Sequence, residues 1–62
     1  MIYNIIANLE DGHNVFTGQL GFVPRKGEVI SIAGHEFIVL LVKYVLTEGT
    51  SHSTTVYLTL KH

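Results

Sequence analysis

The sequence predicts an all-β protein: five short antiparallel strands in meander order, curled into one small barrel that takes in residues 1–62. Residues 54–61 alternate polar and apolar side chains at the period of a strand. Turn-forming residues recur at intervals of about ten positions, the spacing of strands in small all-β domains. No stretch favours a helix. Five strands in so short a chain can bury one face only if the sheet curls on itself.

The expected strands follow from the apolar runs and the turn residues between them. Residues 1–9 form the first strand, and its core face carries Tyr3, Ile5, Ala7 and Leu9. Asp11-Gly12 tolerates the positive φ values of a hairpin turn, so residues 14–18 return as a short second strand. The other expected elements are an irregular stretch at 19–26 that folds partly over the core, strands at 28–33, 36–48 and 54–61, a turn at Gly34-His35 and a polar loop at 49–53.

The middle of the chain carries a more specific pattern. A Pro-x-x-Gly-acid turn precedes alternating aliphatic residues, then a glycine turn, then an aromatic residue followed by valines. The residues are Pro24, Gly27, Glu28, Ile30, Ile32, Gly34, Phe37, Val39, Val42 and Tyr44. This stretch resembles short bacterial and phage proteins with SH3-like barrels. The resemblance implies an SH3-like fold and carries over no binding residue, because barrels of this shape serve many unrelated functions.

The same pattern fixes which side chains face inward. If Phe37 and Val39 point to the core, Val42 follows them inward only with a β-bulge near Leu40-Leu41. The outer side of this strand is then apolar: Val29, Ile38, Leu40 or Leu41, and Val45, with only Lys43 polar among them. Either the loop at residues 20–23 covers this side within one subunit, or it is an interaction surface. A chain this short has little material to cover two faces, which favours the interaction surface.

The leading functional hypothesis is therefore a non-enzymatic protein-interaction module. Its expected contact residues are Ile38, Leu40, Val45 and the amphipathic aromatic Tyr57. The expected partner is a second copy of the chain, in a homo-oligomer, or a larger host protein. The resemblance to phage and bacterial proteins extends this to an accessory or inhibitor protein encoded by a phage or mobile element.

Two alternatives remain open. The first is an oligomer that binds a small anionic ligand such as a nucleotide in a pocket between subunits, using Phe22, Arg25, Lys26 and the histidines. The second is weak binding of single-stranded nucleic acid, which needs a basic groove with stacking aromatic residues. Four Lys and Arg residues against five Asp and Glu give a net charge of −1, which disfavours nucleic acid as the partner.

The sequence predicts neither catalysis nor a metal or other cofactor. Ser51-His52-Ser53 sets hydroxyls beside an imidazole, but no residue is placed to orient that base. The four histidines match no ligand spacing, and the chain has no cysteine. No apolar run approaches the ~18 residues of a membrane span, and the first residues lack the basic region of a signal peptide. A cytoplasmic location is the expectation.

Overall fold

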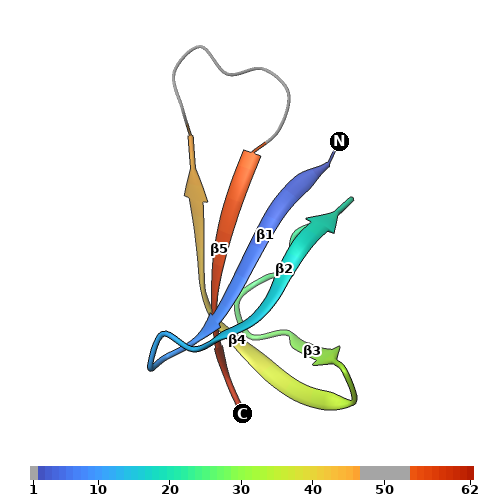
Figure 1. Ribbon diagram of the computed structural model, residues 1–62, viewed down its shortest axis with the longest axis vertical. Coiled ribbons are helices and arrows are strands. Elements are labelled where there is room, and N and C mark those ends of the chain that lie inside the picture. Colours follow the sequence, from blue (N-terminus) through green and yellow to red (C-terminus); the bar gives the residue numbers. More distant parts are fainter. Residues whose placement is uncertain (1, 47–53) are drawn as a thin grey trace.

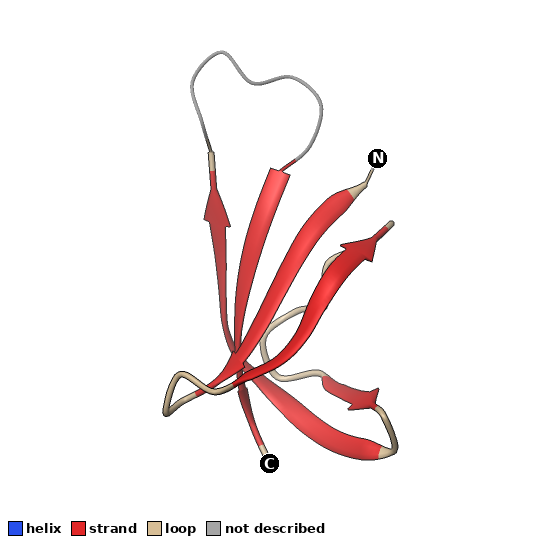
Figure 2. Ribbon diagram, in the orientation of Figure 1, coloured by secondary structure: helices blue, strands red, loops and turns tan. Residues whose placement is uncertain are grey.

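The computed structural model describes residues 2–46 and 54–62, and this part of the chain consists of strands and connecting loops (Figure 2). Its five strands form one sheet (Figure 1). They are β1 (Tyr3–Leu9), β2 (Asn14–Leu20), β3 (Val29–Ile32), β4 (His35–Val45) and β5 (Thr54–Lys61). The all-β prediction is confirmed. The expected end of the fourth strand at 47–48 and the polar loop at 49–53 lie outside the described residues.

The sheet is mixed, so the prediction of an antiparallel meander is wrong. The strand order is β2-β1-β5-β4-β3. β1 pairs antiparallel with β2 but parallel with β5, whereas β5 and β3 both pair antiparallel with β4. The last strand thus lies between β1 and β4, and the sheet curls into a half-barrel with β2 and β3 at its two edges (Figure 1). Alternation along a strand identifies its buried face but not its neighbours, which is why the sequence did not reveal this pairing.

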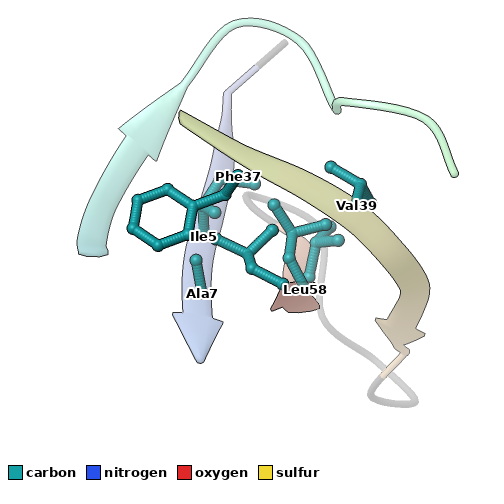
Figure 3. Packing of buried hydrophobic residues seen from close by; sticks show 7 residues of the cluster. Ile5, Ala7, Phe37, Val39 and Leu58 are labelled. Carbon is teal, nitrogen blue, oxygen red and sulfur yellow. The ribbon is translucent and has the colours of Figure 1, made fainter. Parts of the chain in front are cut away.

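The core lies on the concave face of the sheet, over its central strands (Figure 3). Seven side chains are at most 2% exposed: Ile5, Ala7, Phe37, Val39, Val56, Leu58 and Leu60. β5 contributes three of these residues at alternate positions, which explains why it takes the centre of the sheet. The predicted core faces of β1 and β5 are both confirmed. Burying each large aliphatic side chain contributes roughly 1.5–3 kcal/mol.

The predicted bulge in β4 is present. Val39 pairs with Leu60 and Leu41 with Thr59, so Leu40 is the extra residue on the β4 side. The bulge returns Val42 to the inner face, where it packs against the core. The strand's far end extends beyond the core: Tyr44 is 52% exposed, and Leu46, which follows the strand, is 80% exposed. β3 is shorter than β4 and pairs only with residues 35–38, so the sheet offers no further strand to cover that end.

One turn and one strand differ in detail from the sequence prediction. Ile32 pairs with His35, so the β3–β4 turn is Ala33-Gly34, one residue earlier than predicted. Both turn residues have positive φ, 52° and 84°, as a two-residue hairpin of this kind requires. β2 is also longer than expected, because Gln19 and Leu20 continue to pair with Asn4 and Tyr3.

Candidate functional site

The outer face of the sheet divides into two regions of opposite chemistry. Its apolar half lies on β3, β4 and β5 and comprises Val29, Ile38, Leu41, Val45 and Tyr57, which are 59%, 41%, 55%, 36% and 39% exposed. Its polar half lies on β1 and β2 and comprises Asn4, Asn8, Asn14, Thr17 and Gln19. The strand register aligns the two halves side by side, since Ile6 of β1 pairs with both Thr17 and Tyr57.

The polar half is tied together by its own side chains. Asn14 Nδ2 donates a hydrogen bond to Asn8 Oδ1 at 2.9 Å, and Gln19 Nε2 donates to Asn4 Oδ1 at 3.0 Å. Thr17 Oγ1 donates to Asn14 Oδ1 at 3.3 Å. These amides and hydroxyls face water and also bond to one another across β1 and β2. A contact on this half would have to compete with both water and these internal hydrogen bonds.

The apolar half contains three of the four predicted contact residues. Ile38, Val45 and Tyr57 lie on it and are exposed. Leu40 is only half-buried, whereas its neighbour Leu41 is 55% exposed and pairs with Thr59 of the outer face. Leu41 is thus the residue that sequence reasoning did not select. A bulge sets two residues against one, so alternation alone cannot choose between them.

The loop at residues 20–23, one of the two expected covers for this face, packs elsewhere. Leu20 and Val23 are partly buried against the core cluster, and Pro24 is buried. Phe22, in contrast, is 63% exposed. Apart from Phe22, the large apolar residues of this loop therefore fold back over the core on the inner side of the sheet. They do not cover the apolar half, whose side chains keep the exposures given above. Two lysines lie among these apolar residues: Lys43 pairs with Tyr57, and Lys61 pairs with Ile38, across β4 and β5.

A separate groove brings together the three predicted ligand-binding residues. Its volume is about 590 Å³, and it lies between β4, the start of β1 and the loop that follows β2. Its lining residues are Tyr3, Gly21, Phe22, Val23, Pro24, Arg25, Lys26, Leu41, Val42 and Tyr44. The groove forms within a single chain, whereas the sequence hypothesis placed it between subunits. Leu41 belongs both to the groove and to the apolar half.

Backbone hydrogen bonds hold the basic wall of this groove in place. Gly27 N–H donates to the Val39 carbonyl at 2.8 Å, and Val39 N–H donates to the Glu28 carbonyl at 2.9 Å. Glu28 N–H closes a turn onto the Arg25 carbonyl at 3.1 Å, while Glu28 Oε1 accepts from Arg25 N–H at 2.6 Å. Gly27 adopts φ 92° in this turn, a conformation that residues with a Cβ rarely adopt. Arg25 and Lys26 are therefore carried on a constrained loop.

None of the three histidines that the structure describes lines this groove. His13 follows the β1–β2 turn and His35 opens β4. His62 stacks at a tilt on Phe37, with ring centroids 4.7 Å apart. His52 lies outside the described residues. Within residues 2–46 and 54–62, no three His, Asp or Glu side chains gather as a metal site would require.

A second, smaller cavity of about 180 Å³ opens on the concave side of the sheet, against the core. It is lined mainly by apolar side chains: Ile5, Ala7, Phe16, Leu20, Phe22, Pro24, Ile30, Ser31, Ile32 and Leu58. The Phe16 ring lies over Gly18, where an added Cβ would come within 2.8 Å of it. This glycine therefore lets an aromatic side chain pack flat along the edge strand.

Comparison with known proteins adds no relative: no protein family, curated protein or solved structure matches this chain. The described residues also contain no helix long and apolar enough to cross a membrane.

Proposed function

We propose that the protein is a non-enzymatic interaction module that associates with a second copy of itself through the apolar half of its outer face. The observation that carries this proposal is the exposure of five large apolar side chains on one face of one sheet. Monomeric soluble proteins rarely expose contiguous apolar patches larger than a few hundred Å², and larger patches mark interaction sites.

The energetics of a short chain support self-association. A domain of this size buries a smaller fraction of its surface than larger domains and is correspondingly marginal in stability. Each aliphatic side chain that a dimer contact removes from water contributes at most roughly 1.5–3 kcal/mol. Four aliphatic residues per subunit can thus contribute enough free energy to hold two folded subunits together. Tyr57 adds an aromatic ring with a polar tip, which suits the rim of such a contact.

The resemblance of the central hairpin to short phage and bacterial proteins suggests a biological role for such a module. Such a module would serve as an accessory or inhibitor protein, with the same face available to a larger host protein. An SH3-like origin of the half-barrel is part of this proposal and depends on the turn and strand pattern of residues 24–44.

Sedimentation equilibrium of the purified chain between about 1 µM and 1 mM tests self-association, because this range spans weak to moderate dimer affinities. We expect a dimer that Ile38→Asp and Leu41→Asp each convert to a folded monomer. Thr17→Asp is the matched control, since it adds the same charge to the polar half and should leave the dimer intact. Circular dichroism checks that each variant remains folded.

Two results would contradict the proposal. A wild-type chain that stays monomeric throughout this range would exclude self-association and favour a larger host protein as the occupant. Equal loss of the dimer in Thr17→Asp and Leu41→Asp would show that added charge, rather than the apolar half, disrupts the contact.

A further inference from the structure

We propose that the groove between the Arg25-Lys26 loop and β4 binds a mononucleotide-like ligand, a flat aromatic ring joined to a phosphate. This site is distinct from the self-association face in its chemistry, although Leu41 borders both. Its volume of about 590 Å³ lies within the range of small-molecule sites, roughly 300–1,000 Å³.

The charge of the groove favours an anion. Two of the four Lys and Arg residues in the chain, Arg25 and Lys26, line it side by side, and no acidic residue is among its lining residues. Within the described residues, neither cationic side chain forms an ion pair. The nearby Glu28 carboxylate is engaged by Arg25 N–H. Both cations can therefore turn to a bound phosphate, where hydrogen bonds between ionised groups are about twice as strong as neutral ones.

The rest of the groove favours a flat ring. Tyr3, Phe22 and Tyr44 contribute three aromatic side chains, of which Phe22 is 63% and Tyr44 52% exposed. Exposed rings of this kind have faces free for stacking, and stacking of a base on an aromatic side chain contributes roughly 1–3 kcal/mol. Val23 and Val42 supply apolar surface beside them. Aromatic and cationic groups thus meet in one groove, as a base and its phosphate require.

The loop is suited to hold this arrangement without a ligand. The two backbone hydrogen bonds between Val39 and the Gly27-Glu28 segment fix the loop to β4, and Pro24 of the same loop is buried. A site that is already ordered loses less conformational entropy on binding. The aromatic residues come from β1, the loop and β4, so the complete set exists only in the folded chain.

Titration of the ¹⁵N-labelled protein with adenosine monophosphate, followed by NMR, tests the site. We expect chemical-shift changes at groove residues, with weaker binding of adenosine alone and of inorganic phosphate alone. Arg25→Ala with Lys26→Ala should weaken binding by roughly tenfold or more, because it removes both charge-assisted contacts. Tyr44→Ala should weaken it by roughly fivefold or more through lost stacking.

Matched controls separate the groove from general charge and aromatic content. Lys43→Ala with Lys61→Ala removes the same net charge from the outer face and should change affinity by less than about twofold, because neither lysine lines the groove. Tyr57→Ala removes an exposed tyrosine elsewhere and should have no effect. The monomeric Ile38→Asp variant should still bind, so failure of the self-association proposal would not affect this result.

Three outcomes would overturn the proposal. The first is no shift at about 10 mM ligand, a concentration that would detect even very weak binding. The second is equal loss of affinity in the two double-alanine variants. The third is an oligothymidine that binds more than about tenfold tighter than the mononucleotide, which would reassign the groove to single-stranded nucleic acid.

Discussion

On the outer face of this sheet, β1 and β2 present mainly asparagine, threonine and glutamine beside Ile6, whereas β3 and β4 present mainly valine, isoleucine and leucine beside Lys43. Both regions share one curved sheet and one buried face, so the fold alone does not require the difference. The polar half bonds to itself through side-chain amides and hydroxyls. The aliphatic side chains of the apolar half form no hydrogen bonds with water or with one another. Contact with another apolar surface is therefore favourable, because it removes them from water.

The largest expected effect is the difference in stability loss between a substitution in the core and one in the apolar half. Leu58→Ala should lower the free energy of unfolding by about 2–5 kcal/mol, because this side chain is 2% exposed and its removal leaves a cavity. Leu41→Ala should cost less than about 0.5 kcal/mol in a dilute sample, as expected at an exposed site. Urea denaturation of both variants at one low concentration measures the difference. Similar losses of stability in the two variants would show that Leu41 supports the fold of the monomer, and the apolar half would then not differ from the core.

An intermediate effect is expected in the polar half. Asn14 Nδ2 donates to Asn8 Oδ1 at 2.9 Å and to the Ala7 carbonyl at 3.2 Å. Asn14→Ala should therefore lower the free energy of unfolding by roughly 1 kcal/mol, the net contribution of such hydrogen bonds. Sedimentation should show an unchanged association state, because the substitution lies outside the apolar half. A change in that state would contradict the division of the face.

The smallest change in the free energy of unfolding is expected at the β3–β4 turn, which lies at the edge of the sheet. Ala33 adopts φ 52°, a left-handed conformation that costs an L-residue roughly 1–2 kcal/mol and glycine very little. Ala33→Gly should raise the free energy of unfolding by up to about 1 kcal/mol, less the backbone entropy that glycine loses. His35→Gly is the control and should not stabilise, since His35 pairs within the strand. A stabilised His35→Gly would instead favour the turn one residue later.

The sequence was informative where a side-chain pattern has one physical solution. Alternation identified the buried faces of β1 and β5, and the three-residue step from Val39 to Val42 required the bulge that the structure contains. The exposed apolar side of β4 followed from the same reasoning. The buried faces, the bulge and the apolar side of β4 depend on residues close together in the chain, so the sequence pattern is enough to predict them.

Features that depend on distant segments were not predictable in the same way. The parallel pairing of β1 with β5 leaves no mark on either strand's alternation, so a meander was the simpler expectation. Phe22, Arg25 and Lys26 were identified as candidate ligand residues, but Tyr3 and Tyr44 join them only because the sheet brings the start of β1 and the end of β4 beside the loop. The choice between Leu40 and Leu41 likewise needed the actual register.

Concentration-dependent NMR spectra of the ¹⁵N-labelled wild-type chain test the division of the outer face most directly. Dilution reports, residue by residue, which surface a second copy covers. We predict that the amide signals of Val29, Ile38, Leu41, Val45 and Tyr57 shift with concentration, while those of Thr17 and Gln19 stay fixed. Shifts confined to β1 and β2, or signals that do not change at any concentration, would contradict the account.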